Sequence, residues 1–210
     1  MNFRNFLLES NFYNKGTLNL LKQFKEKNNE ELYIIFSDEP KLSKKKIFSD
    51  FDIYGLIGYN IDDIIKKLKN KEVLGINSWA IKKYIIVTKL FRGKILNIHD
   101  YNKNKKLAED IITLKKLFYK LYQKNDIDEI WKNIIHQSQK KFEKNWFKQL
   151  MSIVKSMSLI LNINANQILR ELKYSAIKAD NSDDSFKSSN PEFFYLSIKN
   201  IKIIEILDNI

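Results

Sequence analysis

The chain has 210 residues, no cysteine, and 37 lysines and arginines against 25 acidic residues, a formal net charge of +12 at pH 7. This length suits one folding unit with one sizeable core. The lack of cysteine excludes disulfides, zinc–thiolate centres and thiol nucleophiles, so a reducing cytoplasm is the expected compartment. No apolar run approaches the ~18 residues of a membrane span, and residues 1–15 do not resemble a signal peptide, so we expect no membrane association.

The positive charge favours a polyanionic partner, with nucleic acid first. Lys, Asn, Ile, Phe and Tyr are all abundant, and a low-GC coding bias would produce the same charge without a functional cause. Arginine occurs only at Arg4, Arg92 and Arg170. Lysine acts as a point charge for phosphates, whereas bidentate arginine suits base recognition. We therefore expect binding to a nucleic-acid backbone without sequence recognition.

The first part of the chain predicts a compact αβ unit. Thr17 can cap a helix whose apolar residues recur at helical spacing. The apolar run 32–36, bounded by acidic residues on both sides, is typical of a buried strand. Asn60 offers a cap to a helix over 61–69, in which acids occupy the first turn and lysines the last.

Further strands are predicted on either side of Gly93 and near the end of the chain. Residues 84–88 and 94–98 indicate two strands joined around this glycine, although the pattern of residues 84–88 is also compatible with a helix. Residues 201–207 form a nearly continuous apolar run, which favours a buried position in a sheet. Strands near both ends of a chain with a helical middle usually share one sheet.

Residues 105–162 carry the clearest periodicity and predict a helical arm. Apolar residues repeat at alternating steps of four and three from Leu107 to Leu121, which indicates one amphipathic helix with a lysine-rich outer face. Asp126 with Glu129 forms a capping-box pattern that opens a second helix, which continues to Asn162. Two long antiparallel helices are expected.

We therefore predict an α/β protein with a small α/β head, in which one sheet joins N- and C-terminal strands, and a long antiparallel helical arm. The head is expected to contain residues 1–100 and 190–210, and the arm residues 101–178. Residues 179–191 are polar and poor in apolar side chains, and are expected to form a mobile loop.

Lysines gather on the arm and on one loop of the head. Between Tyr101 and Leu150, twelve lysines against six acids leave a surplus of six, half of the net charge of the chain. Any one of these lysines can equally serve only to solvate a helix surface. The expected nucleic-acid-binding residues are Lys44, Lys45, Lys46, Lys103, Lys105, Lys106, Lys115, Lys116, Lys140, Lys141 and Lys144.

The alternative to a binding protein is an enzyme that uses Asp50 and Asp52. On a strand, this Asp-x-Asp pair would place two carboxylates on one face, the geometry that holds magnesium in nucleotidyltransferases. Phe36-Ser37 stands upstream at about the distance of that family's Phe-Gly-Ser turn, but the glycine is missing. Aspartates at a turn more often serve as caps. A third hypothesis is an accessory protein of a mobile element whose arm docks a protein partner. We expect a non-enzymatic protein with no catalytic residue.

Two smaller patterns have ordinary structural explanations. His99-Asp100 could suggest metal or catalytic chemistry, but the other histidine, His136, lies on a different predicted helix. Gly55 and Gly58 match no glycine-rich phosphate loop and are expected to serve turns.

Three segments resemble the small DNA-end-binding ring proteins that accompany type II-A CRISPR adaptation. The first is Met1-Asn2-Phe3-Arg4-Asn5-Phe6-Leu7-Leu8-Glu9 followed by Gly16-Thr17. The second is Phe36-Ser37-Asp38 with the later stretch from Asp52 to Asp62. The third is the close of the chain from Phe194 to Glu205. None of these segments is a catalytic signature.

The resemblance implies a head related to a degenerate ATPase fold and a long helical leg. It also implies a homo-oligomer, a tetrameric ring lined by lysines that binds double-stranded DNA ends, and calcium in the assembly. The expected role is spacer acquisition in antiviral defence. The sequence departs from the family in the short stretch after Gly16 and in the polar loop at 179–191, and it identifies no metal ligands.

Overall fold

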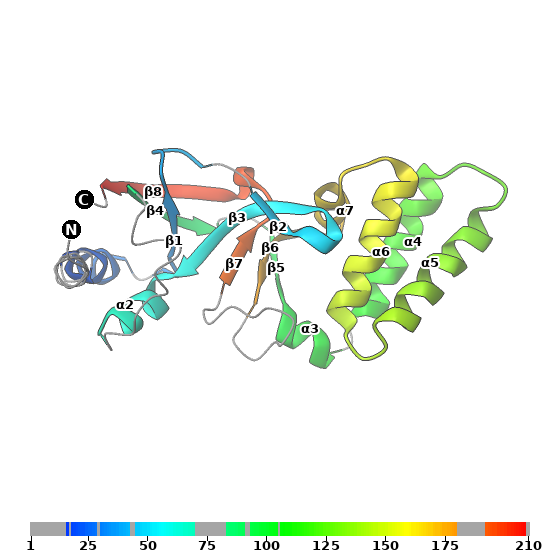
Figure 1. The fold of residues 1–210 in the computed structure, drawn as a ribbon, viewed down its shortest axis with the longest axis horizontal. Helices are drawn as coiled ribbons and strands as arrows, with labels where there is room; N and C mark the ends of the chain where they lie inside the picture. The colour runs from blue at the N-terminus through cyan, green and yellow to red at the C-terminus, as the bar shows by residue number, and fades with distance from the viewer. Residues whose placement is uncertain are drawn as a thin grey trace, which may run out of the picture.

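The structure, a computed structural model, describes residues 16, 18–28, 30–42, 45–69, 83–90, 93–104, 106–179 and 192–208. It is a mixed α/β protein, as predicted, with helices at both ends of a central sheet (Figure 1). Strands near both ends of the chain belong to this sheet. Within the described residues, no helix combines the length and the apolar character needed to cross a membrane.

The strands follow the order β5-β6-β7-β3-β1-β4-β8, and β2 pairs with β3 beside this path. The pairing of β5 with β6 is parallel, and the other pairings are antiparallel. The bounds are β1 Tyr33–Ser37, β2 Lys45–Phe48, β3 Ile53–Asn60, β4 Tyr84–Leu90, β5 Lys94–Asn97, β6 Tyr174–Lys178, β7 Glu192–Tyr195 and β8 Ile201–Asp208.

The sheet is strongly curled. The strands β4 and β5 were expected to be neighbours around Gly93, but β6, β7, β3 and β1 lie between them in the strand order. Five strand spacings would separate them by about 24 Å in a flat sheet. The chain from Leu90 to Lys94 can span at most about 14 Å. The sheet must therefore bend until β4 approaches β5, and an ion pair of 3.9 Å between Glu31, just before β1, and Lys178 of β6 crosses the same concavity.

The concave face of the sheet encloses a core of its own. Tyr33, Phe193 and Tyr195 meet there, with ring centroids 4.0 Å apart for Tyr33 and Phe193 and 4.9 Å apart for Phe193 and Tyr195. Gly58 of β3 lies between the two strands that carry these rings, because it pairs with Phe193. Gly58 was predicted to lie in a turn, but it lies inside strand β3. The absence of a side chain there leaves room for the aromatic rings.

The opposite face of the sheet carries the helices. At one end, α2 Ile61–Lys69 and the helix over 18–26 cover β1 and β4, and together they bury Leu21, Ile34 and Ile64. The predicted cap of α2 is confirmed, because Asn60 Oδ1 accepts hydrogen bonds from Asp62 N at 2.9 Å and Asp63 N at 3.4 Å. Thr17, the predicted cap of the preceding helix, lies outside the described residues.

At the other end, the arm packs on β5, β6 and β7. Its helices are α4 Leu107–Leu121, α5 Ile127–Lys141 and α6 Trp146–Leu161, which stand between α3 Ile98–Asn104 and α7 Ala165–Glu171. One core joins Phe194 and Ile177 of the sheet to Leu114, Phe118 and Val154 of the arm. Head and arm therefore share their apolar interior and form one folding unit.

Several predicted boundaries were wrong. The second arm helix breaks at residues 142–145 into α5 and α6, so the arm is a bundle of α4, α5 and α6. The arm ends before 178, because Tyr174–Lys178 forms β6 inside the sheet. Strand β8 is an edge strand rather than a buried one, and Ile203 is 42% exposed. Of the predicted loop at 179–191, all but Ala179 lies outside the described residues.

Candidate nucleic-acid interface

The lysines of the arm lie on the faces that point away from its core. In α4 the core side consists of Leu107, Leu114 and Phe118, and in α5 of Trp131, Ile134 and Ser138. The lysines alternate with these positions at helical spacing, so their side chains are directed to solvent. The exposed arm lysines are Lys106, Lys115, Lys116, Lys120, Lys124, Lys132, Lys140, Lys141 and Lys144.

Among the described residues, these exposed arm lysines form no ion pair. Between described residues, the ion pairs lie on the head or join the head to α6: Lys25–Asp62, Lys41–Glu39, Lys89–Glu30, Lys178–Glu31 and Lys155–Asp52. None of these pairs includes a lysine of α4, of α5 or of the turns that follow them. No described acid therefore competes at ion-pair distance with an external anion for these ammonium groups.

Neighbouring aromatic rings restrict three of these side chains. Lys115 Nζ lies 5.1 Å from the ring centre of Tyr119, and Lys124 Nζ lies 5.5 Å from that of Tyr122. Lys141 Nζ lies 5.3 Å from the ring centre of Phe142. A cation over an aromatic face is attracted to it while part of its hydration shell remains. These contacts hold the lysines near the arm surface and leave them open to phosphate.

A partly buried network of polar side chains brings α3 and the turn between α5 and α6 to the same end of the arm, which lies lowest in Figure 1. Asn102 Oδ1 accepts a hydrogen bond of 2.9 Å from Phe147 N. Asn145 caps α6, with its Oδ1 at 2.9 Å from Lys148 N. The Gln149 side chain, 1% exposed, donates to the carbonyl oxygens of Phe142 and Glu143 at 3.0 and 3.1 Å.

This network gathers basic residues from separate parts of the chain. Lys103 is exposed in α3, Lys140 and Lys141 are exposed at the end of α5, and Lys144 is exposed in the turn. The first turn of α6 contains no acid. We call these four residues, with Lys106 at the start of α4, the basic end of the arm.

The remaining predicted binding residues are less fully described. Lys44 and Lys105 lie outside the described residues. Lys45 and Lys46 belong to β2, where they pair with Gly55 and Tyr54 of β3. This pairing places the backbone of Lys45 and Lys46 at the sheet, on the strand that leads into the 3-10 helix Ser49–Phe51.

The Asp50-x-Asp52 pair is not on a strand, so the geometric premise of the enzyme hypothesis was wrong. Asp50 lies in the 3-10 helix Ser49–Phe51, and Asp52 follows with a left-handed backbone, φ 55°. Lys155 of α6 donates a hydrogen bond of 2.6 Å to Asp50 O, and its Nζ lies 4.0 Å from Asp52 Oδ2. The turn therefore connects the head to the arm, and the Lys155 ammonium group lies beside the Asp52 carboxylate.

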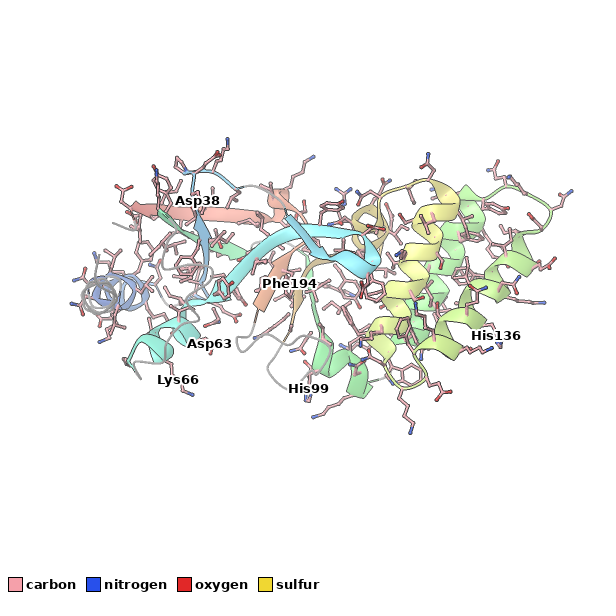
Figure 2. The ribbon with its side chains drawn as sticks, viewed as in Figure 1. Asp38, Asp63, Lys66, His99, His136 and Phe194 are labelled. Atoms are coloured by element: carbon pink, nitrogen blue, oxygen red, sulfur yellow. The ribbon has the colours of Figure 1, made fainter. Side chains whose placement is uncertain are left out.

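The described residues do not support a metal centre. They contain no group of three or more His, Asp or Glu side chains that could hold a metal ion. His99 of α3 and His136 of α5 lie well apart (Figure 2). The calcium implied by the family resemblance stays a prediction.

One polar cluster was missed by sequence reasoning. Asp110 of α4 accepts hydrogen bonds from Tyr101 Oη at 2.8 Å and Tyr174 Oη at 3.0 Å. Burial raises the pKa of Asp110, while these two hydrogen bonds and the charge of Lys94 lower it in part. The three residues come from α3, α4 and β6, and no local motif links them. The cluster joins arm to head and lies inside the protein, so we assign it to structure.

The fold and this surface define a mixed α/β protein with a lysine-rich helical arm. Comparisons with protein-family models, with curated proteins and with solved structures each found no match.

Proposed function

We propose that the protein is a non-enzymatic, sequence-independent double-stranded DNA-binding protein, and that the exposed arm lysines contact the DNA backbone. The observation that carries this proposal is the set of exposed lysines on α4, α5 and their turns, none of them ion-paired with a described residue. When such ammonium groups bind DNA phosphates, they displace the cations that are condensed on the DNA, and the release of these cations drives association.

The arm also has suitable dimensions. Each of α4 and α5 contains 15 residues, which corresponds to about 22 Å of helix. A duplex carries one charge per about 1.7 Å of its axis, so an arm of this length faces several phosphates at once. A lysine ammonium group provides positive charge but, unlike the guanidinium group of arginine, it discriminates little between bases. Binding should therefore be tight at low salt and indifferent to sequence.

The resemblance to the CRISPR adaptation proteins extends the proposal. On that basis the protein acts as a homo-oligomer, a tetramer, that binds DNA ends during spacer acquisition. Two features of the fold support this extension: strands from both ends of the chain in one head, and a basic helical arm. A preference for linear over circular duplex would favour the extension.

The first test replaces two outward-facing lysines of α4. Lys116→Gln with Lys120→Gln should reduce the magnitude of the log–log salt slope of DNA binding by about 1.8, because each lost phosphate contact contributes about 0.9. The loss of affinity should be equal across unrelated sequences. Binding is measured by fluorescence anisotropy over a salt series.

The matched control removes two exposed lysines from the head. Lys66→Gln with Lys69→Gln in α2 changes the net charge by the same amount; Figure 2 shows Lys66 at the end of the molecule opposite the arm. The control should keep the slope of the natural protein. Equal effects of the two double variants would contradict a binding surface on the arm and indicate a response to net charge alone.

A further inference from the structure

The turn between α5 and α6 carries three of the lysines at the basic end of the arm. Lys140 and Lys141 are the last residues of α5, and Lys144 stands in the turn itself. All three are exposed, and Glu143 is the one acid in the segment 140–144. Because like charges this close in the chain repel one another, a free turn would separate these side chains. Other residues must therefore hold the turn in place.

Gln149 holds this turn from inside the arm. It lies in the first turn of α6, and it is buried. Its Nε2 donates hydrogen bonds to the carbonyl oxygens of Phe142 and Glu143, at 3.0 and 3.1 Å. A glutamine amide supplies two donor hydrogens without adding positive charge to a lysine-rich turn. One neutral side chain thus ties the end of α5 to the start of α6.

Phe142 attaches the same turn to the head. The centroid of its ring lies 6.3 Å from that of Phe51, in the 3-10 helix before β3. The Lys141 ammonium group lies near the same Phe142 ring, 5.3 Å from its centre. The turn is therefore fixed to α6 on one side and to the head on the other, while its lysines stay exposed to solvent.

The backbone of the turn does not depend on Gln149 alone for its hydrogen bonds. The Phe142 carbonyl oxygen also accepts a hydrogen bond of 2.9 Å from Asn145 N. Glu143 is exposed, which allows water to replace the amide at its carbonyl oxygen. An apolar side chain of the same length at position 149 would therefore leave both carbonyl oxygens with a partner. We expect the position of the lysines, more than the stability of the fold, to depend on Gln149.

We propose that Gln149 is a positioning residue for DNA binding and that it acts through Lys141 and Lys144. It keeps the turn in one conformation, so these two lysines meet phosphate groups without first being ordered. Pre-ordering raises affinity, because the entropy of these side chains is not lost on association. The inference rests on the proposed DNA binding and adds to it a buried residue that does not itself contact DNA.

Gln149→Met tests the proposal, because methionine keeps the length of the side chain and removes both donor hydrogens. The affinity for duplex DNA, measured by fluorescence anisotropy, should fall by about threefold to tenfold, the size expected when about one flexible side chain must be ordered on binding. This loss should disappear in a protein that already carries Lys141→Gln with Lys144→Gln, because the residues through which Gln149 acts are then absent. Gln167→Met, at an exposed position of α7, is the matched control and should keep the natural affinity.

Amide hydrogen exchange gives a readout that does not require DNA. Exchange at residues 142–145 should be faster in Gln149→Met than in the natural protein, while exchange in the middle of α4 stays the same. Phe142→Leu releases the same turn from Phe51 and should show the same dependence on Lys141 and Lys144, so the proposal can be tested even if Gln149→Met does not fold.

Three results would overturn the proposal: unchanged exchange in the turn, natural DNA affinity of Gln149→Met, or an equal loss of affinity with and without Lys141 and Lys144. The last result would show that Gln149 has only a general structural role. Failure of the natural protein to bind DNA is a different outcome, because it would contradict the proposed function itself and this proposal with it.

Discussion

Gly58 shows how one residue allows the sheet to curl around its aromatic core. A Cβ atom at this position would lie 2.9 Å from Cε2 of Tyr195 and 3.5 Å from the carbonyl oxygen of Phe193. The Tyr195 ring cannot move aside easily, because it is fully buried and its hydroxyl lies 3.0 Å from Thr88 Oγ1. Rings from neighbouring strands thus take the space that a side chain would occupy.

Gly58→Ala should therefore destabilise the protein by about 1–3 kcal/mol, the usual range for overpacking. Chemical denaturation with urea measures this change. Gly16→Ala is the matched control, because no atom lies within 4 Å of the added Cβ and the residue is helical. The control should be neutral or stabilising by about 0.5–1 kcal/mol. Equal stability of the two variants would show that the rings do not need this space.

The position of Gly58 could not be predicted, whereas that of Ile34 could. The run 32–36 is apolar and bounded by charged residues, so local pattern alone indicates a buried strand. A glycine is compatible with a turn or a strand, and the choice here depends on Phe193 and Tyr195 of β7. These partners come from the far end of the chain, and local pattern contains no information about them.

At the scale of elements, the junction between arm and head depends on Asp110. Burial of its carboxylate is the largest influence on its pKa and raises it, Glu109 raises it further, and Tyr101, Tyr174 and Lys94 oppose this effect. A carboxyl whose pKa is higher in the folded state binds its proton more tightly there. Its contribution to stability is therefore complete below the unfolded pKa and is lost as the pH rises through the folded pKa.

Asp110→Asn should be more stable than the natural protein at neutral pH, because it keeps an acceptor for both tyrosines without the buried charge. This advantage should shrink as the pH falls through the folded pKa of Asp110, and thermal unfolding between pH 4 and pH 7 measures it. Asp110→Ala should instead destabilise at every pH, by about 1–3 kcal/mol for each hydroxyl left without an acceptor. An advantage of Asp110→Asn that does not vary with pH would contradict this account.

The elements of the arm were only partly predictable. The repeat of Leu107, Leu114 and Phe118 defines α4 because a helix buries every third or fourth residue. The break before Trp146 was missed because the apolar stripe continues in phase across it, and no proline or glycine marks the turn. Asn145 is the one local sign, since asparagine is a favoured helix cap. Asp126 precedes α5 as predicted, but its side chain makes no cap hydrogen bond.

At the scale of the whole molecule, helices cover one face of the sheet and the other face closes on itself. This arrangement places the exposed arm lysines on α4, α5 and their turns, at the end of the molecule where the arm packs on the sheet. The lysine-rich composition of the arm was evident from the sequence. The pattern of ion pairs could not be predicted from the sequence, because partners such as Glu31 and Lys178 meet only once the sheet has formed.

The central claim is that the exposed arm lysines bind the backbone of double-stranded DNA. The most direct measurement is the affinity of the purified protein for linear duplex, circular duplex and single-stranded DNA over a salt series, with and without calcium. The account predicts salt-sensitive binding to duplex, with a log–log slope of about 0.9 per phosphate contacted and no dependence on base sequence; preference for linear duplex would favour the ring proposal. Binding that is unchanged by salt, that requires one base sequence, or that is absent for all three DNAs would contradict it.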